Sequence, residues 1–144
     1  MNLKQLAKKV DLLDGEITVW YMPFSNLRSQ MIVDNIIEAF PDTETWPHWL
    51  RQFTFFEAYA IDAKLKTNSK NAHVRGLQMY MDKRNGSIAE RADLFSYAVS
   101  RELQGVLFDA YTATREELPG VSPELAAGKP DNSDPEAVSD GGKR

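Results

Sequence analysis

The sequence predicts a mainly α fold: a small helical bundle of about four helices with an N-terminal β-hairpin and a disordered C-terminal tail. Three observations predict it. Two β-prone arms flank an Asp14-Gly15 turn. Apolar residues then recur at helical spacing through most of residues 25–110. The last 26 residues hold four Pro, four Gly and no aromatic residue, so they bury too little apolar surface to offset the entropy of ordering.

Length and composition limit the chain to one ordinary domain. It has 144 residues, of which 42% are hydrophobic and 26% charged, a balance typical of soluble globular proteins. We therefore expect a helical domain with its hairpin over residues 1–118, and a flexible, acidic, Pro/Gly-rich tail over residues 119–144. The chain has no cysteine, which excludes disulfides, thiolate nucleophiles and cysteine-bound metals. No apolar run is long enough to span a membrane and the N-terminus does not resemble a signal peptide, so we expect a cytoplasmic protein.

The N-terminal segment predicts the hairpin. Asp14-Gly15 is a strong signal for a two-residue turn. After it, Ile17, Val19 and Tyr21 alternate with two residues that also suit a strand. The apolar residues before the turn also fit one face of a helix, so we expect a short helical or irregular lead-in to the hairpin.

Two helices are expected next. The first begins near Ser25, which can cap it, and ends before Pro41. The second begins near Thr45, with Pro47 tolerated in its first turn. Its apolar positions continue to Leu65, and they are Trp46, Trp49, Leu50, Phe53, Phe56, Ala60, Ile61 and Leu65. The polar run 67–71 then predicts a loop.

The last third of the domain predicts two more helices. A short one places Val74, Leu77 and Met81 on one side and ends at Asn85-Gly86. The residues Ser87-Ile88-Ala89-Glu90 form a capping box at the start of the final helix. Its apolar positions step by four and three over about six turns, which predicts one continuous helix. They are Ile88, Ala92, Phe95, Val99, Leu103, Val106 and Ala110.

The residues show no catalytic or cofactor-binding pattern. The two histidines, His48 and His73, stand 25 positions apart without ligand spacing. Neither accompanies a nucleophile elbow, and no Gly-rich phosphate loop occurs. Carboxylates such as Glu38 and Asp109 fall on predicted polar faces. We therefore expect a protein that is not an enzyme and that holds no metal or cofactor.

Aromatic residues suggest a partner-binding surface. Several lie away from the apolar face of their predicted helix, and they dominate protein interfaces where they are exposed. A central helix buried on most sides would also explain them. The candidate partner-binding residues are Trp46, Phe55, Tyr59, Phe108 and Tyr111.

A basic segment is the only electrostatic feature that suggests a polyanion partner. Residues 64–91 carry seven Lys/Arg against two Asp/Glu, a net charge of +5, whereas the whole chain has a net charge of −4. A small nucleic-acid-binding regulator would use this segment. The basic residues fall on predicted loops and helix ends, so a solvated surface explains them more simply.

The layout resembles the tail assembly chaperones of lambda-like long-tailed bacteriophages. The resemblance covers the turn–strand–helix segment DGEITVWYMPFSNLRSQMI, the helical middle with FDAYTATREELP, and the acidic tail. Its most specific point is Gly142-Lys143. In this family a programmed −1 frameshift occurs near the end of the short reading frame, and the slippery heptamer commonly encodes Gly-Lys.

The resemblance implies a role in virion assembly. The short form would bind the tape measure protein and keep it soluble, and the frameshifted form would also recruit the major tail protein. The chaperone would be absent from the mature virion and would act in the host cytoplasm. The free edge of the hairpin would allow homo-oligomers. A structural head–tail or tail component is the remaining alternative.

Overall fold

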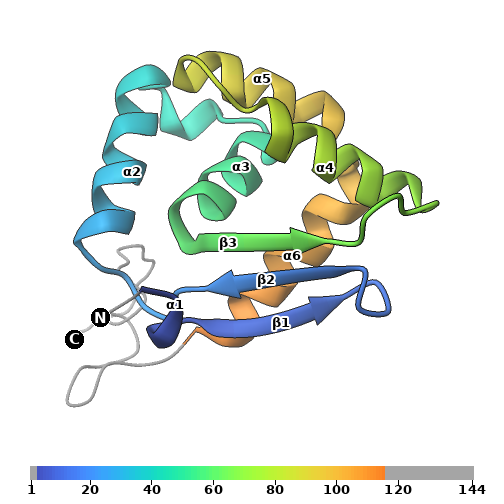
Figure 1. The fold of residues 1–144 in the computed structure, drawn as a ribbon. Helices are drawn as coiled ribbons and strands as arrows, with labels where there is room; N and C mark the ends of the chain where they lie inside the picture. Colours follow the sequence, from blue (N-terminus) through green and yellow to red (C-terminus); the bar gives the residue numbers. More distant parts are fainter. Residues whose placement is uncertain (1–2, 116–144) are drawn as a thin grey trace, which may run out of the picture.

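A computed structural model describes residues 3–115 of the chain (Figure 1). The described part is mostly helical with a three-stranded sheet, which confirms the mainly α prediction in outline. Its elements are α1 (Leu3–Leu6), β1 (Lys8–Leu12), β2 (Ile17–Tyr21), α2 (Leu27–Ala39), the 3-10 turn η1 (Thr43–Thr45), α3 (His48–Tyr59), β3 (Ala60–Leu65), α4 (Ala72–Lys83), α5 (Ile88–Ala98) and α6 (Arg101–Thr114). The tail over 119–144, the domain boundary at 118 and the dipeptide Gly142-Lys143 lie outside the described residues.

The predicted hairpin is present and forms two strands of the sheet. β1 pairs antiparallel with β2 from Lys8 opposite Tyr21 to Leu12 opposite Ile17. Residues 13–16 make the turn, which is longer than the two-residue turn expected. Leu13 and Asp14 adopt φ of 51° and 56°, and Gly15 adopts φ of 83°. Glycine adopts such a positive φ without steric cost because it has no Cβ. The short helix α1 is the helical lead-in.

The third strand corrects the prediction of one helix from Thr45 to Leu65. Helix α3 ends at Tyr59, and the N–H of Ala60 donates the last helical hydrogen bond to Phe56. Residues 60–65 then pair antiparallel with the second edge of β2, from Ile17 opposite Leu65 to Tyr21 opposite Ala60. Apolar and polar residues alternate along this segment, so it suits a strand once β2 offers unpaired backbone groups.

The last helix is also shorter than expected, because the chain breaks between α5 and α6. Val99 has a ψ of 116° and Ser100 a ψ of 155°, both extended. The Ser100 side chain caps α6 by accepting from the N–H of Leu103 at 3.1 Å. Gln104 donates to the Val99 carbonyl at 3.0 Å. Side chains thus form hydrogen bonds with backbone groups at the break. Ser100 caps α6 as Ser87 caps α5, and this second serine is the sequence signal that marks the break.

Helix α3 is the centre of the structure (Figure 1). It contacts α2, α5 and α6, and it leads directly into β3. Helix α6 lies behind the sheet in Figure 1, and the hydroxyl of Tyr21 on β2 donates to the Leu107 carbonyl of α6 at 2.8 Å. The core between these elements includes Ile17, Val19, Phe53, Leu77, Tyr80 and Ala92, each with an exposed fraction of 0%. Within residues 3–115, no helix is both long and apolar enough to cross a bilayer.

Candidate interaction surfaces

Four of the five aromatic residues predicted to bind a partner come together, but they pack against one another. Phe55 and Tyr59 lie on α3, and Phe108 and Tyr111 lie on α6. The Phe55 ring centroid is 5.1 Å from that of Phe108 and 5.3 Å from that of Tyr111. Tyr59 and Tyr111 are 7% and 4% exposed. The cluster joins α3 to α6, as expected of a central helix buried on most sides, and partner binding there stays a prediction.

The hydroxyl groups of Tyr59 and Tyr111 also form hydrogen bonds within the chain. The Tyr59 hydroxyl hydrogen-bonds the Ser25 hydroxyl at 2.8 Å. Ser25 is therefore not the cap of α2, which is Asn26 in a capping box with Ser29. Arg115 donates to the Tyr111 hydroxyl. Burial raises the pKa of Tyr111 to about 12, although the nearby Arg115 cation opposes the shift.

The fifth predicted residue, Trp46, lies apart from this cluster. Its indole Nε1 donates to the Phe40 carbonyl at 2.8 Å, and its side chain packs partly buried against the core. The indole thereby ties the η1 turn to the end of α2.

Each of the two histidines hydrogen-bonds a polar side chain of the same chain: His48 contacts Gln52 and His73 contacts Ser100. No group of three His, Cys, Asp or Glu that could hold a metal occurs among residues 3–115.

Sequence reasoning missed the apolar residues that are exposed. Leu27 and Met31 on α2 are 76% and 56% exposed, although both belong to the apolar pattern of their helix. Leu27 lies about 180° around the helix axis from the buried Ile36, at 3.6 residues per turn. An apolar pattern too wide for one buried face is the signal that could have found them. Such a pattern does not say which side faces solvent.

Two more exposed leucines lie at the same end of the sheet. Leu3 and Leu6 of α1 are 43% and 45% exposed. Helix α1 precedes β1, whose first residue pairs with Tyr21 at the end of β2. Helix α2 begins six residues after Tyr21, so its first turn starts from that end too (Figure 1). We call these four residues the apolar end: Leu3, Leu6, Leu27 and Met31.

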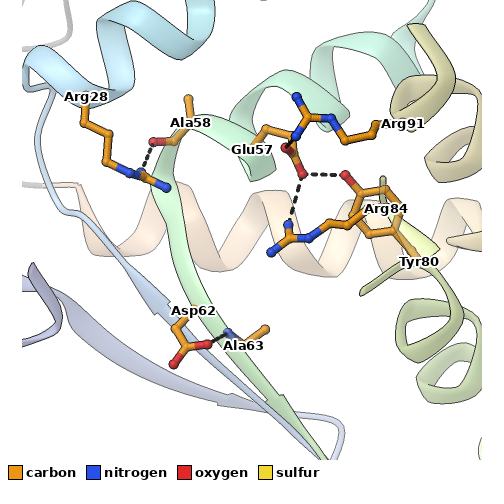
Figure 2. Close-up of polar contacts among 8 residues, drawn as sticks. All are labelled: Arg28, Glu57, Ala58, Asp62, Ala63, Tyr80, Arg84 and Arg91. Carbon is orange, nitrogen blue, oxygen red and sulfur yellow. Dashed lines mark hydrogen bonds and ion pairs between the residues drawn. The ribbon is translucent and has the colours of Figure 1, made fainter. Parts of the chain in front are cut away.

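A polar cluster surrounds the point where α3 becomes β3 (Figure 2). The Glu57 carboxylate, 9% exposed, lies 3.2 Å from Arg84 and 3.7 Å from Arg91. The Tyr80 hydroxyl also donates to it. Burial and the Glu57 carboxylate raise the pKa of Tyr80 above its usual range. Arg28 of α2 donates to the Ala58 carbonyl at 3.2 Å, on the other side of the same junction.

The basic segment 64–91 divides between separate places in the fold. Arg84 and Arg91 face Glu57. Arg75 donates to the Lys70 carbonyl at 2.6 Å and, with Lys66, lines a hollow of about 450 Å³ beside the loop before α4. Lys64 stands on the sheet opposite Thr18 of β2. Lys64 and Lys66 also line a second hollow of about 430 Å³ on the sheet, together with Lys9 of β1. The positive charge of the segment is thus divided between the Glu57 cluster and the hollows beside the sheet and the loop before α4.

Comparison of the chain with protein-family models, curated proteins and solved structures gives no match.

Proposed function

We propose that the chain is a phage tail assembly chaperone that binds the tape measure protein and keeps it soluble in the host cytoplasm during tail assembly. The observation that carries the proposal is the apolar end, in particular Leu27 and Met31. They stand one helical turn apart on the outside of α2 and are 76% and 56% exposed. Residues at this spacing are neighbours on a helix surface and can pack against the apolar face of a client helix.

The size of the apolar end suits temporary binding. Fully burying a leucine or methionine side chain contributes about 1.5–3 kcal/mol, and association costs about 4–15 kcal/mol in lost freedom of motion. Two exposed side chains, Leu27 and Met31, therefore favour a weak and reversible complex. A chaperone that leaves before the virion is complete requires such a complex.

The proposal includes the longer product that the resemblance implies. A frameshift near Gly142-Lys143 would append a second domain that recruits the major tail protein, with residues 119–144 as the linker. Mass spectrometry of the products of the natural gene with its downstream DNA tests this part. We expect a minor longer product that shares the sequence up to about Lys143 and then changes frame. A 144-residue product alone would contradict the recoding part of the proposal.

Co-expression with the tape measure protein of the same phage tests the main proposal. We expect the native chain to keep the tape measure protein in the soluble fraction and to co-purify with it. The double variant Leu27→Ser/Met31→Ser should leave the tape measure protein in the pellet, because the client loses its apolar contact. Tyr97→Ser is the matched control, since Tyr97 is a 71% exposed apolar residue on α5.

Three outcomes would contradict the chaperone function. The first is equal solubilisation by the double variant and the native chain. The second is the presence of the chain in purified mature particles, which would indicate a structural tail component. The third is salt-sensitive binding of DNA through residues 64–91 with no effect on the tape measure protein, which would indicate a nucleic-acid-binding regulator.

A further inference from the structure

The strand order leaves β1 at an outer edge of the sheet. The order is β1-β2-β3, so β2 is paired on both sides. Strand β1 lies at the border of the sheet farthest from α3 (Figure 1). The free edge of the hairpin is therefore the outer side of β1 alone.

The backbone groups of Lys9 and Asp11 point outward from this edge. The carbonyl of Glu16 accepts a hydrogen bond on the β3 side. Backbone groups alternate in direction along a strand, so those of Val19 face the other way, toward Val10 of β1. The groups of Lys9 and Asp11, on either side of Val10, then face away from β2. Within the described part of the chain, no backbone hydrogen bond reaches these outward groups.

The side chains of Lys9 and Asp11 lie on the face of the sheet away from the core. Both are exposed, whereas Val10 between them is partly buried and packs against the core. Asp11 accepts from the Thr18 hydroxyl at 2.7 Å through one carboxylate oxygen. A carboxylate can accept further hydrogen bonds from a cation. The edge thus carries one positive and one negative side chain, two positions apart on the same face.

A second copy of β1 matches this edge in one antiparallel register. Centred on Val10, that register would set Lys9 of each copy opposite Asp11 of the other, with their outward N–H and C=O groups bonded to each other. Opposite charges directly across a sheet stabilise the pairing, and like charges oppose it. The adjacent registers that also match the outward groups would set Lys9 opposite Lys9, or Asp11 opposite Asp11. Lysine on an edge strand usually prevents pairing between copies, but here Asp11 offsets it in the register centred on Val10.

The opposite border of the sheet is less suited to a second strand. In β3, the N–H of Ala63 points away from β2 and already donates to the Asp62 carboxylate at 2.8 Å. Asp62 also pairs with Lys4 at 2.7 Å, and the Lys4 ammonium lies 3.9 Å from the Trp20 ring centroid. One outward donor of β3 is therefore in use, whereas those of β1 are open.

We propose that the outer edge of β1 binds a second copy of the chain, which joins the two sheets into one continuous sheet across a two-fold axis. The interface is isologous, because the same five-residue strand supplies both halves. The ladder is short, so the dimer is weak and forms at high protein concentration. This inference goes beyond the proposed function, because the client takes no part in it.

The concentration dependence of the full chain tests the inference. Sedimentation equilibrium should show a monomer–dimer equilibrium between micromolar and millimolar protein. Amide hydrogen exchange, followed by NMR, should slow at Lys9 and Asp11 as the protein concentration rises, because their N–H groups become bonded. Val10, whose N–H already faces β2, is the internal control and should change little.

Charge reversal tests the register. Lys9→Asp would set carboxylates opposite each other, and Asp11→Lys would set ammonium groups opposite each other. Each variant alone should raise the dissociation constant of its dimer by about tenfold or more, because two pairs per dimer change from attraction to repulsion. An equimolar mixture of the two variants should dimerise again, since every opposing pair then has opposite charges. Lys64→Asp on β3 is the matched control, and it should leave the native dimer unchanged.

Three outcomes would overturn the inference and leave the chaperone function standing. The first is a native chain that stays monomeric at millimolar concentration. The second is a dimer that both single variants leave unchanged, since the copies would then meet elsewhere. The third is slow exchange at Lys9 and Asp11 that does not depend on concentration, which would indicate that another segment of the same chain covers the edge. Circular dichroism checks that each variant is folded, and recovery of the dimer in the mixture requires both variants to be folded.

Discussion

The ring of Tyr59, the last residue of α3, lies 4.7 Å from the ring of Tyr111 on α6, centroid to centroid. This contact occurs at the residue where the chain changes from helix to strand. It joins two helices that are more than forty positions apart in the sequence. The aromatic cluster therefore fixes the position of the end of α3 relative to α6. Its members are four of the five aromatic residues that the sequence predicts to bind a partner.

Replacing Tyr111 tests the structural role of this cluster. Tyr111→Ala should lower the free energy of unfolding by about 3–5 kcal/mol, because it leaves a cavity among Phe55, Tyr59 and Phe108. Urea unfolding followed by circular dichroism measures the change. Tyr97→Ala is the control, since Tyr97 is 71% exposed, and its effect should stay within about 0.5 kcal/mol. Equal effects of the two substitutions would show that the cluster is not a packing element.

Glu57 is expected to stabilise the junction between α3 and β3 through its arginines. Glu57→Gln should lower the free energy of unfolding by about 1–3 kcal/mol, because Arg84 and Arg91 then lose their shared counter-charge while partly buried. Glu38→Gln, an exposed change on α2, should have little effect. Thermal unfolding at neutral pH compares the two variants. A Glu57→Gln protein as stable as the native chain would show that the cluster does not hold the junction.

Alkaline pH should unfold the protein through its buried tyrosines. Burial raises the pKa of Tyr111 to about 12 and also raises the pKa values of Tyr21 and Tyr80. A tyrosine in the unfolded chain ionises near pH 10, so the unfolded state releases its protons first. The stabilisation is therefore complete below about pH 10 and is lost as the pH rises toward 12.

Urea midpoints measured between pH 8 and pH 12 check this expectation. Tyr111→Phe removes one of the titrating hydroxyls, so its midpoint should fall less steeply over this range. Absorbance at the phenolate band reports the ionisation itself. A native midpoint that is flat up to pH 12 would contradict the burial of these hydroxyls.

Two glycines give opposite expectations for the same substitution. A Cβ on Gly76 of α4 would lie 2.2 Å from the carbonyl oxygen of Ala98, so Gly76→Ala should destabilise by about 1–3 kcal/mol or more. Gly105 in α6 has no neighbouring atom within 4 Å of the same position, so Gly105→Ala should stabilise by up to about 1 kcal/mol. Differential scanning calorimetry of both variants measures the two directions. Two changes of the same sign would place the contact between α4 and the end of α5 in doubt.

The local signals in the sequence located several boundaries. Ser87 and Glu90 satisfy each other's backbone N–H groups at the start of α5, as the capping box predicts. The Asp14-Gly15 turn lies in the hairpin loop, and α4 runs through its predicted apolar positions. Each of these features depends on residues within about four positions of one another, so no distant part of the chain is needed to establish them.

The candidate site was less accessible to sequence reasoning. Glu57, Tyr80 and Arg91 come from three different helices and Arg84 follows the second of them, and nothing in their spacing indicates that they meet. Phe55 and Tyr59 do not belong to the apolar positions predicted for their helix, and the helix that covers them, α6, begins more than forty residues later. Sequence periodicity reports that a face is apolar. It does not report whether the same chain or a partner covers it.

The sequence by itself determined a mainly helical domain with an N-terminal hairpin, because turns, caps and amphipathic periods are short-range properties. Only the tertiary structure decided that residues 60–65 leave the helix to pair with β2, since the open edge of β2 outweighs the helical preference of that segment. The tertiary structure also decided that Ile36 is buried while Leu27 faces solvent, because the helices that pack against α2 cover one side of it. That choice places the apolar end, and with it the proposed client site, on the surface.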